Sequence, residues 1–481
     1  MIKHIFILFF ILSCEQKNKT IIERVIPSNP VDVPPAKIPD EIGFVDVDIL
    51  ESAILLDLNT LNDNDRLNAR YLISCDEFNQ GNFNKKQINW AQNKLLNSIS
   101  SESSVSKAKQ LDNVPCVARF DIEDFGITRN QINAIASQFL LLRIDSLTTR
   151  FQQIQFLTQS LNPYFFAHDF SVTTLGADDL TKENNIYYTL IEQPFGLDDF
   201  FDSLGVNVQN EADAERLIMT AIGSSSQIAL QKSRGVQIAE ADELFVMTTY
   251  DSSLENQDDH FTNPFTVEIA NAQGVRRSNK IFTDNAQEHL YFLKNGFLAG
   301  RLNGAGGNAE FEAPNTVVIN TAAASRQLSP TIHIGSCIGC HTQPFIRYND
   351  QLENHLKTSA NFDANERNLG QVFFSQERTE EAAELMNEAY QDALKKIGAQ
   401  GNVDWVHEKL IFPLRVEQTA ERVCGMLLLP LDECLNRIRG SAVSGGVFGN
   451  LLNGGKVSLP VLSENFRQLV IDVQAFEDGG L

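Results

Sequence analysis

The chain has 481 residues, of which 43% are hydrophobic, and a formal net charge of −23 at pH 7. This length is enough for two to four globular domains, and the hydrophobic content is ordinary for folded proteins. The acidic balance argues against a nucleic-acid partner and against attachment to anionic lipid through charge, because both need a basic surface.

The first segment, residues 1–13, has the pattern of an export signal. Its apolar run, Ile5–Leu12, is far too short to span a bilayer, which takes about 20 residues, and fits the hydrophobic region of a signal peptide. The segment ends in Ile11-Leu12-Ser13-Cys14, which resembles the lipobox of bacterial lipoproteins. We therefore expect a lipoprotein signal peptide with the lipid on Cys14. An ordinary signal peptide with an incidental cysteine is the alternative.

Residues 14–45 are polar and rich in proline, which stiffens an extended chain. We expect this segment to be a tether between the lipid and the first domain. No later segment is long and apolar enough for a transmembrane helix. The expected location is the bacterial cell envelope, with the chain lipid-anchored to a membrane and facing the periplasm or the cell exterior.

Residues 46–166 are predicted to form a helical N-terminal domain. The apolar spacing predicts helices over Asp48–Leu58, 64–75, Gln87–Ser98 and Asn130–Ser146, and a short strand and turn over Cys116–Gly126. The segment contains no plausible metal cluster or catalytic constellation. We expect Arg70-Tyr71 and Arg119-Phe120-Asp121 to belong to a buried polar scaffold.

Residues 167–335 are predicted to form a mixed α+β domain. The patterns predict helices over Leu197–Leu204 and Glu211–Ile222, and strands over Leu244–Tyr250, Phe265–Ala270 and Thr316–Asn320. The clearest strand pair is His289–Leu302, because Asn295-Gly296 is a strong hairpin signal between two apolar runs. The loop Gly304–Gly307 is not followed by Lys-Ser or Lys-Thr, so it is not a phosphate loop.

Residues 336–400 contain the motif Cys337-Ile338-Gly339-Cys340-His341. A Cys-x-x-Cys-His run is typical of covalent c-type haem attachment. The two thiols add to the vinyl groups of the haem, and the histidine binds the iron from the proximal side. The two intervening residues make one turn, which places both sulfurs under one edge of the porphyrin. We therefore expect one covalent haem c held by Cys337, Cys340 and His341.

Three other interpretations of this motif stay open. A dithiol redox site needs the two cysteines but not His341. A zinc site needs further ligands at close spacing, and only His333 and His355 are near. A plain structural disulfide is the third. The export signal favours haem c, because covalent haem attachment in bacteria occurs outside the cytoplasmic membrane.

The remaining sequence is predicted to be mostly helical. We expect a long helix over Thr379–Ile397 with Gly398 as its C-terminal cap. Residues 401–481 are predicted to form a helical C-terminal domain with a flexible, glycine-containing stretch over Ser441–Gly455. The chain as a whole is predicted to be α+β and predominantly helical. Its middle mixes α and β structure with antiparallel hairpins, and its N-terminal, haem-bearing and C-terminal units are helical.

The cysteine count fits an oxidising compartment. The chain has seven cysteines, and the lipidation and haem motifs use Cys14, Cys337 and Cys340. The other four form an even number, as expected for disulfides outside the cytoplasm. Sequence order suggests the pairs Cys75–Cys116 and Cys424–Cys434, although three connectivities are open and four buried free thiols are the alternative.

A wider resemblance extends over about residues 46–398. Its motifs are Arg70-Tyr71-Leu72, Asn79-Gln80-Gly81, Lys94–Ser100, Arg119–Asp121, Asp124-Phe125-Gly126, Tyr291–Phe297 and Gly335–His341. In order and spacing these stretches resemble a group of large exported bacterial proteins of uncharacterised function with a single c-type haem site. The resemblance implies an exported haem-bearing protein and supplies no reaction. The stretch Leu230–Ser233 lacks the histidine that these proteins often carry before their central strands.

The sixth iron ligand decides between functions. A closed distal face favours electron transfer, whereas an open face favours small-ligand binding or peroxide chemistry. Our first candidate for the distal ligand is His355, in a predicted helix over Asn349–Lys357, with a surface histidine as the alternative. Met386 is the second candidate, with core packing as the alternative. His289, in a predicted strand, can approach only through tertiary folding.

Three functions follow as expectations. The first is electron transfer or redox sensing by a lipid-anchored protein with one haem c, which makes the chain an electron carrier rather than an enzyme. Its redox partner is unknown. The acidic surface could steer a cationic partner, and the alternative is that the acidity serves only solubility. The second is a haem enzyme of the peroxidase type with an open distal site. The third is an envelope scaffold or binding protein in which the haem is structural.

Overall fold

The fold of this computed structural model is mixed, with helices contributing more residues than strands and with two separate sheets. All described residues belong to the compact unit Ile38–Leu481. The structure describes residues 44–112, 114–137, 164–167, 170, 185–223, 231–242, 244–253, 261–265, 286–304, 307–310, 345, 348–399 and 417–474. No helix within these ranges is long and apolar enough to cross a membrane.

The first part of the fold surrounds a four-stranded sheet with the order β2-β3-β1-β4. Strand β1 pairs antiparallel with β3 and parallel with β4. The elements are α1 (Val47–Leu58), α2 (Asp63–Asn68), β1 (Ala69–Ile73), α3 (Cys75–Asn79), α4 (Lys85–Asn97), β2 (Lys109–Gln110), β3 (Val117–Asp121), a 3-10 turn η1 (Glu123–Phe125), α5 (Arg129–Ser137) and β4 (Tyr164–Phe166).

Local polar side chains set the starts of the N-terminal helices. The Asp46 carboxylate accepts a hydrogen bond from the Ile49 backbone N–H at 2.8 Å and so caps α1. Asn84 and Gln87 form a reciprocal capping box at the start of α4. Such caps satisfy backbone N–H groups that have no partner inside the helix. The two helices lie close to the ranges that the apolar spacing predicts.

The helix predicted over residues 64–75 is correct only as far as Asn68. Asn62, and not Asn64, caps α2, and the helix ends at Asn68. Residues Ala69–Ile73 form β1 and are buried throughout. A strand that is buried on both faces lacks polar alternation, so its sequence resembles a buried helix.

The two faces of β1 contribute to different hydrophobic cores. Leu72 belongs to a core that includes α4 and the second sheet. Tyr71 and Ile73 belong to a core that includes α1 and the C-terminal helices. Successive side chains on a strand point to opposite faces, so one short strand links both cores.

The expected polar scaffold is centred on Asp57, whose carboxylate is buried at the end of α1. It accepts hydrogen bonds from the Tyr71 hydroxyl at 2.8 Å, from Lys109 Nζ at 2.9 Å and from Arg119 Nη1 at 2.8 Å. Burial alone would raise the pKa of Asp57, but the bonds from Lys109 and Tyr71 and the charge of Arg119 lower the pKa below its usual value. These contacts tie α1 to three strands of the first sheet.

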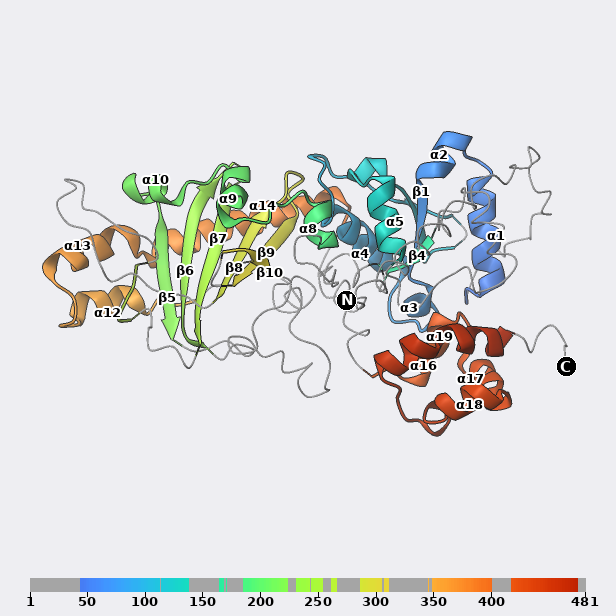
Figure 1. Ribbon diagram of the computed structural model, residues 1–481. Coiled ribbons are helices and arrows are strands. Elements are labelled where there is room, and N and C mark those ends of the chain that lie inside the picture. Colours follow the sequence, from blue (N-terminus) through green and yellow to red (C-terminus); the bar gives the residue numbers. More distant parts are fainter. Residues whose placement is uncertain are drawn as a thin grey trace, which may run out of the picture. The chain divides into compact units, whose positions relative to one another are not determined.

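The second sheet is a six-stranded antiparallel meander with the order β10-β9-β8-β7-β6-β5 (Figure 1). Its strands are β5 (Ile218–Gly223), β6 (Gln231–Ala241), β7 (Leu244–Ser253), β8 (Ala286–Phe292), β9 (Leu298–Gly304) and β10 (Ala309–Glu310). Helices α8 (Ile186–Leu190), α9 (Leu197–Ser203) and α10 (Val208–Asp213) precede it in the chain. The predicted strand over Leu244–Tyr250 is confirmed.

The β8–β9 hairpin is confirmed at Lys294-Asn295-Gly296. The Gly296 N–H donates to Leu293 O at 2.8 Å, and Gly296 has φ +86°. This left-handed backbone conformation favours glycine at the turn. Asn295 Nδ2 donates to Asn97 O at 2.9 Å and attaches the hairpin to the end of α4.

The helix predicted over Glu211–Ile222 is half wrong. Only Val208–Asp213 is helical, and Ile218–Gly223 forms the edge strand β5. Strand β6, its neighbour, has no sequence prediction at all. The predicted strands over Phe265–Ala270 and Thr316–Asn320 fall mostly or wholly outside the described residues.

Three helices follow the second sheet: α12 (Leu352–Thr358), α13 (Ala364–Phe373) and α14 (Gln376–Lys396). Helix α14 runs along the second sheet and contacts β5 and β7 (Figure 1). Its predicted apolar face is buried at Ala382, Met386 and Ala393. Gly398 has φ +80° and ends the helix, as predicted.

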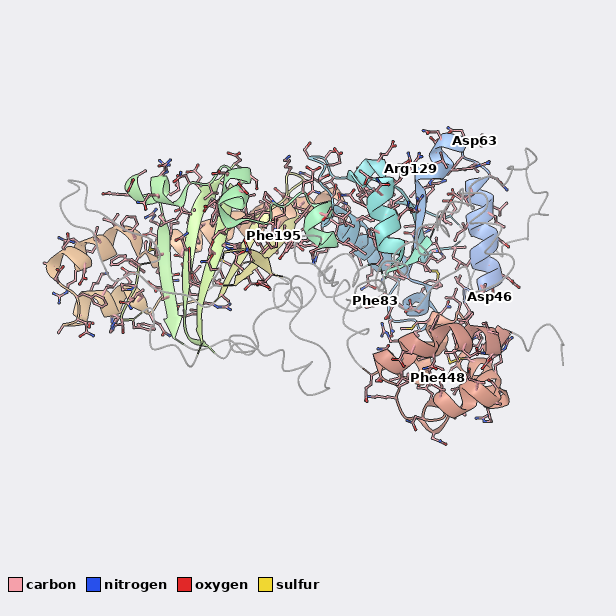
Figure 2. All side chains as sticks on the ribbon, viewed as in Figure 1. Asp46, Asp63, Phe83, Arg129, Phe195 and Phe448 are labelled. Atoms are coloured by element: carbon pink, nitrogen blue, oxygen red, sulfur yellow. A yellow bond between two sulfur atoms is a disulfide. The ribbon has the colours of Figure 1, made fainter. Side chains whose placement is uncertain are left out.

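The C-terminal part consists of α16 (Ala420–Met426), α17 (Leu431–Gly440), α18 (Ala442–Val447), a 3-10 turn η5 (Leu451–Asn453) and α19 (Leu459–Gln474). The stretch Ser441–Gly455, expected to be flexible, is therefore largely helical. The Asp472 carboxylate accepts hydrogen bonds from the hydroxyls of Ser441 and Ser444, which fixes the start of α18. Figure 2 shows Phe448 among these helices, where it is 1% exposed.

Candidate functional site

The predicted haem-attachment residues Cys337, Cys340 and His341 lie outside the described residues, as do Cys14 and His333. The chain is described up to Glu310 in β10 and again at Phe345. The described residues on both sides of the motif show how its ends are held.

On the C-terminal side, Phe345 is fixed to α14. Its backbone N–H donates to Asn387 Oδ1 at 3.1 Å, and Asn387 Nδ2 donates to Phe345 O at 2.9 Å. The Phe345 side chain is 2% exposed, and its ring centroid lies 6.1 Å from that of Phe292 at the end of β8. One asparagine thus satisfies both backbone groups of a residue that closely follows His341.

Asp350 provides a second attachment point, on the edge strand β5. Its Oδ1 accepts hydrogen bonds from the backbone N–H groups of Ala221 at 2.9 Å and Leu352 at 3.0 Å. The hydroxyl groups of Tyr348 and Thr220 also form a hydrogen bond. Burial raises the pKa of both Tyr348 and Asp350.

On the N-terminal side, β10 pairs with β9, with Glu310 opposite Leu302. The Tyr188 hydroxyl donates to Glu310 O at 2.7 Å. Both ends of the segment that contains the motif are therefore attached to the second sheet or to the helix that covers it.

His355, the first candidate for the distal ligand, lies in α12 and is partly exposed. Its Nε2 is 2.9 Å from Phe261 O and donates to that carbonyl. Its ring lies 5.4 Å from the ring of Phe261 and 5.7 Å from that of Phe362. In this arrangement Nδ1 carries the lone pair. Iron binding through Nε2 would first require the hydrogen bond to Phe261 to break.

Met386, the second candidate, is 0% exposed and belongs to the larger core. Met386 therefore packs in the hydrophobic core. His289, the other described histidine, is also 0% exposed, and its Nδ1 is 2.8 Å from Thr248 Oγ1. Among the residues that the structure describes, no group of three or more His, Cys, Asp or Glu side chains could hold a metal ion.

The four cysteines outside the motifs form the two pairs expected from sequence order. Cys75 and Cys116 are bonded at 1.97 Å and join α3 to the residue before β3. Cys424 and Cys434 are bonded at 2.11 Å and join α16 to α17. Of the seven cysteines, those left are the three that the lipidation and haem motifs use.

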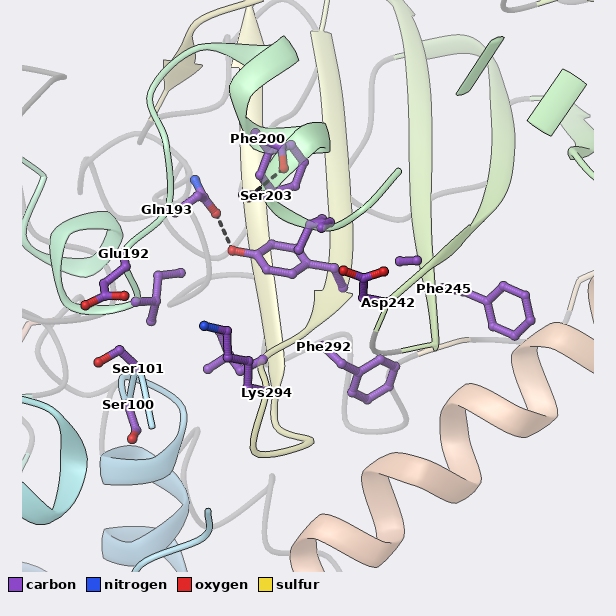
Figure 3. A pocket seen from close by; sticks show the side chains of 15 residues that line it. Ser100, Ser101, Glu192, Gln193, Phe200, Ser203, Asp242, Phe245, Phe292 and Lys294 are labelled. Carbon is purple, nitrogen blue, oxygen red and sulfur yellow. Dashed lines mark hydrogen bonds between the residues drawn. The ribbon is translucent and has the colours of Figure 1, made fainter. Parts of the chain in front are cut away.

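A cavity of about 310 Å³ opens at one end of the second sheet (Figure 3). Its lining comes from five places in the chain: the residues after α4, the loop between α8 and α9, α9 itself, the β6–β7 turn and the β8–β9 hairpin. Phe200 and Tyr291 form part of its apolar floor and are almost fully buried. The Tyr291 hydroxyl donates to Gln193 Oε1, the contact that is drawn in Figure 3.

Arg301 supports this floor from within the protein. Its side chain is fully buried, and its guanidinium lies 4.8 Å from the ring centroid of Phe200. It donates to Asn303 Oδ1 at 2.6 Å and to the backbone oxygens of Pro194 and Phe195. Burial lowers the pKa of Arg301. Sequence analysis missed this cavity, because its lining residues are brought together only by the fold.

Comparisons with protein-family models, with curated proteins and with solved structures gave no match for this chain.

Proposed function

We propose that the protein is an exported, lipid-anchored cytochrome-like protein with one covalent haem c, which transfers electrons or senses redox state in the bacterial envelope. The observation that carries this proposal is the run Cys337-Ile338-Gly339-Cys340-His341. When bound, the haem would supply one-electron chemistry at its iron. Cys337 and Cys340 would hold it covalently, and His341 would be the proximal ligand.

The cysteine chemistry of the described residues supports this proposal. Disulfides at Cys75–Cys116 and Cys424–Cys434 are typical of proteins that fold outside the cytoplasm. Covalent haem attachment in bacteria takes place in the same compartment. The leftover cysteines are the two of the haem motif and Cys14, which we propose as the lipid attachment site.

The two candidates for the distal ligand differ in what they would lose on binding iron. His355 would give up one hydrogen bond, which contributes about 0.5–1.5 kcal/mol net. Met386 would leave a fully buried position, and the burial of such a side chain contributes about 1.5–3 kcal/mol. His355 therefore remains our first choice for the distal side.

Production of the full-length chain together with c-type haem maturation factors tests the proposal. We expect covalent haem in the wild type and none in the double variant C337A/C340A. The double variant C424A/C434A is the matched control, because it removes two cysteines outside the motif and should keep the haem. Equal haem staining of wild type and C337A/C340A would contradict the proposal.

The ferrous protein with and without carbon monoxide then separates electron transfer from open-site chemistry. A low-spin spectrum that carbon monoxide does not change is expected for a haem closed on both faces. A high-spin haem that binds carbon monoxide would favour the open-site enzyme instead.

A further inference from the structure

We propose that the cavity beside Tyr291 binds a small zwitterion, namely a free α-amino acid with an apolar side chain. This proposal is independent of the haem. It rests on the combination of an apolar floor with charges of both signs at the rim that form no ion pair with the described residues.

The floor of the cavity is suited to an apolar group. Leu204 and Phe245 line the cavity and are half-buried, so part of their apolar surface is open to it, whereas the rings of Phe200, Tyr291 and Phe292 are at most 4% exposed and back the floor. The volume of about 310 Å³ is at the lower end of the range of about 300–1,000 Å³ that is usual for ligand pockets. The floor therefore favours a small ligand with one compact apolar or aromatic group.

The rim carries three exposed charged side chains, Glu192, Asp242 and Lys294. None of them forms an ion pair with another residue in the described part of the chain. In the view of Figure 3, Lys294 lies between Glu192 and Asp242. Ser101 and Ser203 also line the cavity, and the Ser203 hydroxyl donates to Phe200 O at 2.7 Å.

Backbone contacts fix the main chain at both acidic rim residues. Glu192 has φ +56°, a left-handed conformation that costs a residue with a side chain about 1–2 kcal/mol. The N–H of the next residue, Gln193, donates to Tyr188 O at 2.8 Å and stabilises this turn. The Asp242 N–H donates to Leu204 O at 2.9 Å, which fixes the β6–β7 turn against the end of α9.

A ligand with a single charge matches this cavity poorly. An anion would face two carboxylates on a chain of net charge −23. A cation would face Lys294, with the buried guanidinium of Arg301 behind the Phe200 ring. A zwitterion places its ammonium group near a carboxylate and its carboxylate near Lys294, so that opposite charges meet in both places.

Isothermal titration of the full-length protein with three related probes tests this proposal. Phenylalanine carries both charges, phenethylamine only the positive one and phenylacetate only the negative one. We expect phenylalanine to bind at least tenfold more tightly than either of the others. No heat from phenylalanine at millimolar concentrations, or equal binding of phenethylamine, would overturn the proposal.

Single substitutions at the rim then test the two charge contacts. Glu192→Gln and Lys294→Met should each weaken phenylalanine binding at least tenfold, which corresponds to about 1.4 kcal/mol. Glu377→Gln is the matched control, because Glu377 is exposed at the start of α14 and does not line the cavity. Binding unchanged in both rim variants, with melting temperatures like that of the wild type, would also overturn the proposal.

Discussion

Replacement of Asp57 by Asn tests the polar scaffold that joins α1 to the first sheet. The substitution removes the negative charge and leaves the shape of the side chain nearly unchanged. Arg119, whose side chain is 21% exposed, loses its ionic partner. A hydrogen bond to a charged group contributes about 1.5–3 kcal/mol. The Lys109 side chain is 52% exposed, so solvent screening limits the contribution of its ion pair with Asp57 to about 0–1 kcal/mol. We expect Asp57→Asn to lower the free energy of unfolding by about 1.5–4 kcal/mol at pH 7.

The pH dependence gives this prediction a second test. The folded-state pKa of Asp57 lies below its usual value, and an aspartate in an unfolded chain has a pKa of about 3.9. The charge of Asp57 therefore stabilises the fold above about pH 4, and this stabilisation is lost as the pH falls through the folded-state pKa. The difference between wild type and Asp57→Asn should accordingly shrink in acid.

Urea denaturation followed by far-UV circular dichroism measures both effects. The control is Asp63→Asn at the start of α2 (Figure 2). The Asp63 side chain is fully exposed, and solvent screens its ion pair with Arg66 at 3.6 Å, so this substitution should shift the urea midpoint much less. A midpoint for Asp57→Asn that equals that of Asp63→Asn would refute the reasoning. So would a difference from wild type that stays constant from neutral to acid pH.

The same structure supports three further predictions. Met386→Ala should lower the free energy of unfolding by about 2–5 kcal/mol, because it opens a cavity in the core. The control Leu385→Ala changes a neighbouring side chain that is 43% exposed and should lower it by at most about 0.5 kcal/mol. A change of haem spin state in Met386→Ala would contradict our preference for His355. Removal of the Cys75–Cys116 disulfide, whose cysteines are 41 residues apart, should lower the free energy of unfolding by about 4 kcal/mol. Removal of Cys424–Cys434, with a separation of 10, should lower it by about 3 kcal/mol. The opposite order of the two effects in urea denaturation would refute the loop-entropy argument. Asn387→Ala should lower the free energy of unfolding by about 1–3 kcal/mol and speed hydrogen exchange at the Phe345 amide. Unchanged exchange at this amide would show that Asn387 does not hold Phe345 in place.

The parts of the fold that depend on local signals could be predicted from the sequence. The helices over Val47–Leu58, Lys85–Asn97 and Gln376–Lys396 show their apolar faces at helical spacing. The β8–β9 hairpin has its Asn-Gly turn, and Gly398 ends its helix. Each of these features needs only a few neighbouring residues.

The parts that depend on distant contacts could not be predicted in this way. Ala69–Ile73 is a strand because both of its faces are covered by separate cores. Ile218–Gly223 pairs with β6, whose own sequence gives little strand signal. The cavity brings together Ser100, Gln193 and Lys294, and no local pattern links these positions. Tertiary contacts override local propensity at all three places.

The most direct measurement for the haem proposal is the mass of the intact, denatured polypeptide made together with c-type haem maturation factors. We predict a mass that exceeds that of the processed, lipid-bearing chain by one haem, since the bonds to Cys337 and Cys340 survive denaturation. A chain without added haem mass, in which both of these cysteines still react with an alkylating reagent, would contradict the proposal.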